Sequence, residues 1–232
     1  KEVNSINPKD WATIIFTSGS TGSPKAVVHS LANHFYNALG ANERMPLNPG
    51  DRWLLSLPMY HVSGLAILFR TLLSGAAMVI PAKNVSLSKT LLSRSVTHLS
   101  LVPTQLHRLL QTTKGKDALC QLKLILLGGA SIPETLLEQS AQLGLNVQTT
   151  YGSTEMASQV ATGKSGFYQV LPFREVRIAA DNEVEVRGKI GFLGYLDGTG
   201  LHQPFDENGW FKTGDIGLWC SKDPKNQGDV DS

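Results

Sequence analysis

The sequence predicts an α/β fold in which a mostly parallel sheet flanked by helices is followed by a small antiparallel β unit. Up to about residue 160, short apolar or β-branched runs alternate with longer segments of helical periodicity. Beyond it, short apolar runs are separated by Asp-Asn, Asp-Gly and Glu-Asn-Gly turns, which favour hairpins. We therefore predict an α/β subdomain at residues 1–160, a small antiparallel subdomain at 161–220 and a tail at 221–232.

The elements of the first subdomain follow one another in a regular order. Apolar and β-branched runs predict strands at 12–17, 25–29, 53–57, 76–80, 97–102, 122–127 and 146–150. Periodicity predicts helices at 30–44, 63–74, 86–93 and 133–143, and one that begins at Pro103. Ser30 can cap the first helix, in which Leu31, Phe35 and Leu39 are spaced for one buried face. Strands that alternate with helices indicate a mostly parallel sheet covered on both faces.

The second subdomain is expected to contain only short strands. Their predicted positions are 173–179, 183–187, 192–195 and 210–212. This pattern is typical of a small antiparallel unit or a distorted barrel.

Composition excludes several classes of protein. The 232 residues are 41% hydrophobic, enough for a sizeable core, and the net charge of +2 comes with no basic stripe typical of nucleic-acid binding. No apolar stretch approaches the ~20 residues that a membrane span needs. Cys120 and Cys220 match no metal or redox spacing, which suits a reducing cytoplasm.

Residues 17–25, Thr-Ser-Gly-Ser-Thr-Gly-Ser-Pro-Lys, directly follow a predicted strand. Glycines let backbone amides approach an anion, hydroxyls add donors and lysine adds the charge that a phosphate requires. The run is not a Walker loop, because Pro24 and Ala26 stand where that loop has Gly and Ser or Thr. The alternative is a flexible linker, which the position between two β-branched strands disfavours.

A second run, Tyr-Gly-Ser-Thr-Glu at residues 151–155, lies at the end of the last predicted parallel strand. Ligands bind outside the carboxyl ends of such strands. Tyr151 can stack on a purine, Thr154 can hold a phosphate oxygen and Glu155 is an oxygen ligand suited to Mg²⁺. The alternative is a turn that leads into a helix.

The third run, Gly-Trp-Phe-Lys-Thr-Gly-Asp at residues 209–215, places a carboxylate after a tight glycine turn. Asp215 can accept hydrogen bonds from two vicinal ribose hydroxyls. Taken alone, the run is equally well explained as a hairpin with a turn aspartate.

Together, the order and composition of the three runs resemble the adenylate-forming superfamily of acyl-CoA synthetases, luciferases and peptide-synthetase adenylation domains, over residues 12–219. The resemblance implies a partial N-terminal domain of such an enzyme. It implies that Thr154 and Glu155 are catalytic, with Glu155 as the metal ligand. The implied nucleotide-binding residues are Thr17, Ser18, Gly19, Ser20, Thr21, Gly22, Lys25, Gly128, Gly129, Ala130, Tyr151, Gly152 and Asp215.

Three further segments, at 56–64, 101–106 and 126–133, are similar to the o-succinylbenzoate–CoA ligases of menaquinone biosynthesis. The resemblance implies activation of a carboxylic acid, o-succinylbenzoate, by ATP and Mg²⁺ through an acyl-adenylate, followed by thioester formation with coenzyme A. His61 would lie near the acyl pocket as a third catalytic candidate, or be a packed histidine that gates it. The alternatives are an adenylation domain for another aryl or fatty acid, and a non-catalytic nucleotide-binding fragment.

The sequence also departs from the family pattern. Against family members the chain is expected to be truncated at both ends and to lack the C-terminal domain with its catalytic lysine, so turnover by the chain alone is expected to be poor. Residues 168–172 read Tyr-Gln-Val-Leu-Pro where relatives usually carry a glycine-bearing turn. Apolar surface left uncovered would favour a homo-oligomer.

Overall fold

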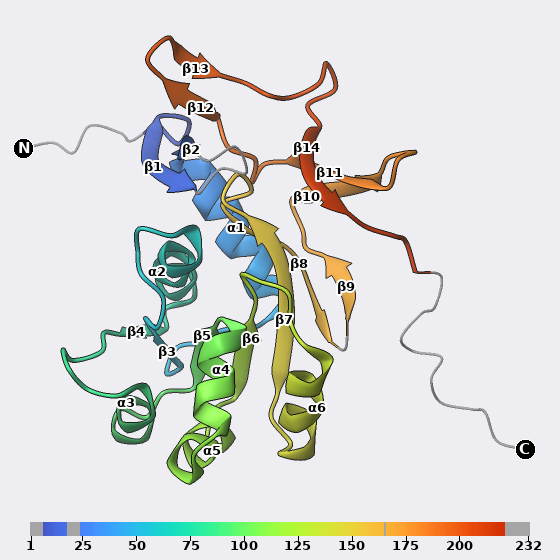
Figure 1. Ribbon diagram of the computed structural model, residues 1–232. Coiled ribbons are helices and arrows are strands. Elements are labelled where there is room, and N and C mark those ends of the chain that lie inside the picture. Colours follow the sequence, from blue (N-terminus) through green and yellow to red (C-terminus); the bar gives the residue numbers. More distant parts are fainter. Residues whose placement is uncertain (1–6, 18–23, 165, 221–232) are drawn as a thin grey trace, which may run out of the picture.

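Three sheets and six helices make up the computed structural model, which describes residues 7–17, 24–164 and 166–220 (Figure 1). The largest sheet is mostly parallel and flanked by helices, and the two smaller sheets are antiparallel. The predicted fold class is confirmed.

The large sheet has seven strands in the order β4-β3-β5-β6-β7-β8-β9. They are β3 (Arg52–Leu54), β4 (Ala77–Val79), β5 (His98–Leu101), β6 (Leu124–Leu127), β7 (Val147–Ser153), β8 (Ser158–Lys164) and β9 (Phe167–Val170). The first five in the sheet order are parallel; β8 then pairs antiparallel with β7, and β9 pairs antiparallel with β8. The boundary predicted at residue 160 thus falls inside β8, whose partners precede and follow it.

Helices cover both faces of this sheet. They are α1 (Leu31–Arg44), α2 (Val62–Ser74), α3 (Leu87–Ser93), α4 (Pro103–Leu110), α5 (Thr113–Cys120) and α6 (Glu134–Gln142). In β6, Leu124 and Leu126 pack with Trp53 and with residues of α1 and α2, while Ile125 and Leu127 pack with residues of α3 to α6. Figure 1 shows α4, α5 and α6 in front of the strands. Apolar side chains at successive positions of β6 therefore pack into two different hydrophobic cores, one on each face of the sheet, as a buried parallel sheet requires.

Helix α1 buries a different face from the one predicted. Phe35 is 39% exposed, whereas Asn33 and Asn37 are buried. The side-chain amide of Asn37 donates to the carbonyl oxygens of Met156 and Gln159, both at 3.0 Å. Burying these carbonyls without donors would be costly, so the helix turns its polar face toward them.

The two smaller sheets complete the molecule. The four-stranded sheet is ordered β1 (Trp11–Thr17), β2 (Lys25–Ser30), β12 (Gly194–Asp197), β13 (Gly200–His202), and the three-stranded sheet is ordered β10 (Arg174–Ile178), β11 (Glu183–Gly188), β14 (Phe211–Ile216). Strands β1 and β2 are antiparallel and stand outside the parallel sheet, because the short connection between them cannot make a parallel crossover. Pairing of β2 with β12 thus joins the start of the chain to its last third.

Among the described residues, no helix combines the length and apolar character that crossing a membrane requires.

Candidate active site

The second and third runs meet directly. The phenol of Tyr151, on β7, donates a hydrogen bond to Oδ2 of Asp215, on β14, at 2.7 Å. Burial is the main reason that the pKa of Tyr151 is raised above its usual range, and the neighbouring carboxylate of Asp215 raises it further. The phenol therefore stays protonated and keeps its role as donor. An aromatic face and an exposed carboxylate consequently lie side by side across two sheets.

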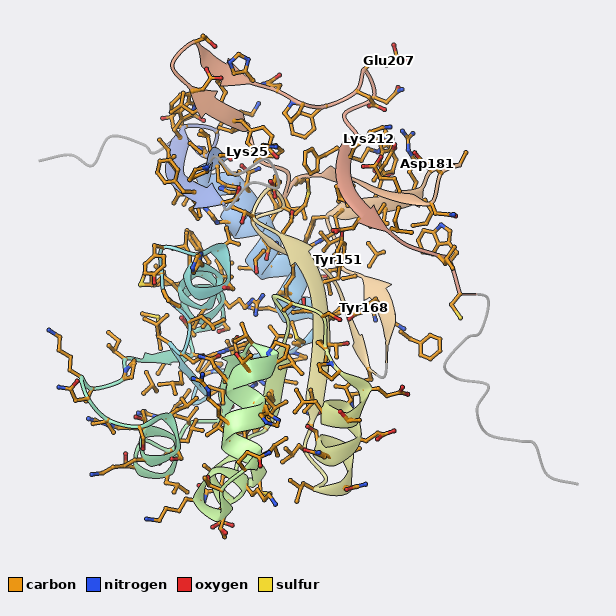
Figure 2. The ribbon with its side chains drawn as sticks, viewed as in Figure 1. Lys25, Tyr151, Tyr168, Asp181, Glu207 and Lys212 are labelled. Atoms are coloured by element: carbon orange, nitrogen blue, oxygen red, sulfur yellow. The ribbon has the colours of Figure 1, made fainter. Side chains whose placement is uncertain are left out.

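The first and second runs meet through a residue that lies in none of the three. The phenol of Tyr195, on β12, donates to Oε1 of Glu155 at 2.8 Å. The Nζ atom of Lys25 lies over the same ring, 5.0 Å from its centroid. Tyr195 thus contacts the cation of Lys25 with its ring face and the carboxylate of Glu155 with its hydroxyl. Burial and the nearby Glu155 raise the pKa of Tyr195 above its usual range. Figure 2 labels Lys25 and Tyr151 in the region where the four-stranded sheet approaches the end of the large sheet.

Strand pairing explains why Lys25 stands at this place. Thr17 and Lys25 are register partners at the loop end of the β1–β2 hairpin, so the two ends of the glycine-rich run are adjacent. The residues between them, Ser18, Gly19, Ser20, Thr21 and Gly22, lie outside the described part of the chain.

A cavity of about 390 Å³ opens beside these groups at the ends of the parallel strands. Five of the predicted site residues line it: His61, Gly128, Gly129, Gly152 and Thr154. Ala130, which is exposed, is not among its lining residues.

Glycine at position 152 has a packing reason. A Cβ atom at this position would lie only 1.7 Å from the carbonyl oxygen of Ser158 on the paired strand. No larger residue lets β7 and β8 approach so closely beside the cavity.

Sequence reasoning missed Arg70, which also lines the cavity. Its side chain comes from α2, is 2% exposed, lies over the ring of Trp53 at 5.2 Å and donates to the side-chain oxygen of Gln159. Burial lowers the pKa of Arg70 to about 9, so it remains cationic at neutral pH. No described acidic side chain pairs with it. An arginine within the apolar run 63–74 was the signal available in the sequence, because such a charge is rarely buried without a purpose.

Glu155 suits a hard cation such as Mg²⁺. Tyr195 occupies one carboxylate oxygen, and among described residues no hydrogen bond is made to the other. The described residues hold no cluster of three acidic, histidine or cysteine side chains that would form a complete metal cage. Mg²⁺ commonly uses one or two carboxylates together with substrate phosphates, so a single glutamate beside a phosphate-binding segment fits this cation.

The chain is similar in sequence to 2-succinylbenzoate–CoA ligases of several bacteria. The 2-succinylbenzoate–CoA ligase of Salmonella typhimurium is 43% identical over 214 residues, which are 90% of this chain and 45% of that protein. The enzyme of the same name from Bacillus licheniformis is 34% identical over 94% of this chain and 49% of its own length. The chain therefore spans about half the length of these relatives.

Solved structures agree. Wild-type E. coli MenE with a bound phenylether-linked analogue of OSB-AMS superimposes with a TM-score of 0.84 and 36% identity, over 95% of this chain and 48% of that one. The o-succinylbenzoate coenzyme A synthetase of Bacillus subtilis in complex with ATP and magnesium gives a TM-score of 0.79 at 30% identity, over 93% and 50%. The family model described as AMP-binding enzyme matches residues 1–195. The predicted resemblance is confirmed, and the chain belongs to the AMP-binding enzyme family.

Proposed function

We propose that this chain is the nucleotide- and acid-binding part of an AMP-forming acid–CoA ligase that acts on o-succinylbenzoate. The observation that carries the proposal is the contact of all three runs, since Tyr195 joins Lys25 to Glu155 and Tyr151 joins the second run to Asp215. The names of the relatives and the ATP–magnesium complex of a structural neighbour support it.

The nucleotide is proposed to lie alongside Tyr151 and Tyr195. Asp215 would accept hydrogen bonds from the ribose, and the ring of Tyr151 would face the adenine opposite Gly128 and Gly129. Lys25 and the hydroxyl-rich run before it would hold the triphosphate. Mg²⁺ bound at Glu155 would neutralise phosphate charge during the reaction.

The acid is proposed to occupy the cavity of about 390 Å³. o-Succinylbenzoate carries two carboxylates, and only one of them is activated. Arg70 is the buried cation in this cavity, so it would bind the carboxylate that does not react. His61, which also lines the cavity, would sense the substrate or gate its entry.

The proposed chemistry needs no nucleophile from the protein. An oxygen of the substrate carboxylate attacks the α-phosphorus of ATP, and the bond to pyrophosphate breaks. The thiol of coenzyme A then attacks the acyl carbon and displaces AMP. The side chains of this chain contribute by holding the reactants in line and by offsetting phosphate charge.

Calorimetric titration tests the proposal. We expect the chain to bind Mg·ATP, and to bind a non-hydrolysable o-succinylbenzoyl-adenylate mimic more tightly than a benzoyl-adenylate mimic of the same linkage. Asp215→Ala should weaken both mimics alike. Absence of any nucleotide binding would refute the proposal, and equal affinity for the two mimics would refute the choice of acid.

A cytoplasmic location and self-association, both predicted from the sequence, belong to the same proposal. Light scattering after size exclusion measures the second.

A further inference from the structure

A buried histidine contacts the backbone of the segment Thr154–Glu155, which is proposed to bind phosphate and Mg²⁺. His29 lies on β2 with none of its surface exposed. Its Nε2 atom is 2.7 Å from the carbonyl oxygen of Thr154, although the two residues are 125 positions apart in the sequence. None of the three runs contains His29, and the chemistry proposed above does not use it.

The contact fixes the form of the imidazole. A carbonyl oxygen only accepts hydrogen bonds, so Nε2 of His29 must carry the proton and donate it. The other ring nitrogen, Nδ1, is buried and has no hydrogen-bond partner among the described residues, in keeping with an unprotonated nitrogen. Desolvation lowers the pKa of His29 to about 4, in agreement with a neutral ring at physiological pH.

The surroundings of His29 hold the ring in place without replacing this hydrogen bond. The ring of His34 lies 5.0 Å away and is itself stacked on Phe69. His34 is engaged with the hydroxyl of Thr13 on β1 at 2.8 Å. The charged group that faces His29 is Glu155, on the segment to which His29 donates.

The turn that receives the hydrogen bond contains two residues with unfavourable backbone conformations. Ala157 and Ser158 follow Glu155 with φ angles of 51° and 117°, values that residues other than glycine rarely adopt. Backbone of this kind persists only where its surroundings impose it. One hydrogen bond inside the turn runs from the amide of Ala157 to the carbonyl oxygen of Thr154, the same atom that His29 contacts.

We infer that His29 is a positioning residue that holds the Thr154–Glu155 segment against the β1–β2 hairpin, so that Glu155 keeps its place relative to Lys25. His29 and Lys25 lie on the same strand, β2, and the carbonyl of Thr154 is one bond away from the backbone nitrogen of Glu155. From the other side, the amide of Phe192 donates to the carbonyl oxygen of Glu155 at 2.8 Å. The segment is therefore fixed by donors on both sides. The inference rests on the proposed function only in assigning Mg·ATP to Lys25 and Glu155.

Two substitutions separate positioning from mere packing. His29→Gln places an amide NH₂ near the position of Nε2 and keeps the donor, whereas His29→Leu keeps the volume and removes the donor. His107→Leu, at an exposed position on α4, is the matched control for loss of a histidine. If His29→Leu does not fold, His29→Asn, whose amide is too short to reach Thr154, takes its place.

The first measurement is independent of nucleotide binding. Hydrogen exchange of the Ala157 amide should be at least tenfold faster in His29→Leu and within about threefold of wild type in His29→Gln and His107→Leu. Nitrogen NMR of the wild-type ring should show the neutral form protonated at Nε2. A ring protonated at Nδ1 alone or at both nitrogens, or equal exchange in the leucine and glutamine variants, overturns the inference.

The second measurement reads the site. His29→Leu should lower the affinity for Mg·ATP at least tenfold and change the affinity for adenosine by no more than about twofold. Adenosine lacks the phosphates and the metal that Lys25 and Glu155 would bind. His29→Gln should stay within about threefold for both. If the wild-type chain binds no Mg·ATP, the proposed function fails, and the exchange rates still decide the role of His29. If both variants bind Mg·ATP like wild type, the inference fails and the proposed function stands.

Discussion

Replacing Arg70 by methionine should make the protein more stable while it removes recognition of the acid. Arg70 is 2% exposed, its guanidinium lies over Trp53, and no acidic side chain among the described residues pairs with it. Methionine has a similar length, is apolar and adapts its shape to irregular space. The substitution therefore removes a buried charge and leaves most of the packing in place.

The size of the gain follows from opposing effects. Burial lowers the pKa of Arg70 from its usual value to about 9, which corresponds to about 5 kcal/mol of destabilisation of the charged form as an upper limit. Against this stands loss of the contact with Trp53, worth about 1–2 kcal/mol, and of the hydrogen bond that Gln159 accepts, worth about 1–3 kcal/mol. We expect a net stabilisation of about 1 kcal/mol, which in a protein of this size raises Tm by about 2–4 °C.

Binding should respond in the opposite direction. Removing one partner of a buried, hydrogen-bonded charge pair costs at least about 2 kcal/mol, or roughly 30-fold in affinity. Arg70→Met should therefore lower the affinity for the o-succinylbenzoyl-adenylate mimic at least 30-fold and leave the affinity for the benzoyl-adenylate mimic unchanged. Thermal unfolding and calorimetric titration measure the two effects on one sample, with Arg70→Lys as the variant that keeps the charge. A methionine variant that is less stable than wild type, or that binds both mimics like wild type, would refute the reasoning.

Three further outcomes are expected. Tyr195→Phe removes the hydrogen bond to Glu155 and keeps the ring, so Mg·ATP should bind about 3- to 10-fold more weakly in a calorimetric titration while adenosine is unaffected. Because the pKa of His29 falls from 6.5 to about 4 and that of His34 to about 3, the unfolded chain binds more protons below pH 6.5. The free energy of unfolding, from urea titrations, should therefore decrease as the pH falls from 6.5, by about 3 kcal/mol from His29 alone at pH 4 and below, and His29→Gln should flatten this slope. Gly152→Ala should lower stability by about 1–3 kcal/mol in the same titrations, since its Cβ would overlap the backbone of β8.

The strands and helices that the sequence predicted best are those whose signals are local. The helix over 63–74 appears as α2, and Gly75 ends it in the left-handed conformation. Strand β9 was missed, although Gly166 directly precedes it. The antiparallel strand β8 was missed as well, because the turn before it, at residues 154–157, contains no glycine or proline. The short helix α5 was missed for a similar reason: only the side chain of Thr112 caps it.

Pairing between strands was harder to predict than the strands themselves. Strand β2 was located correctly, but its partner β12 lies more than 160 residues away, and nothing near Lys25 or Gly194 encodes that pairing. The prediction of which face of α1 is buried was wrong for a related reason. Its asparagines satisfy carbonyl groups of a distant turn, so the side chains that look suited to solvent are the buried ones.

The proposed nucleotide side of the candidate site carries strong sequence signals, whereas on the proposed acid side only His61 was predicted, for one physical reason. Phosphate and metal sites use backbone amides and short side chains that follow one another closely, so the segments proposed to bind these groups are contiguous runs such as residues 17–25 and 151–155. The cavity proposed for the acid is lined by single side chains from separate elements, including His61, Arg70 and Gln159. The residues that connect the two sides, His29 and Tyr195, share a sheet that the linear order of the chain does not suggest. Substitutions within the contiguous runs should therefore affect every acid alike, whereas changes of acid specificity should come from isolated positions on α2 and β8.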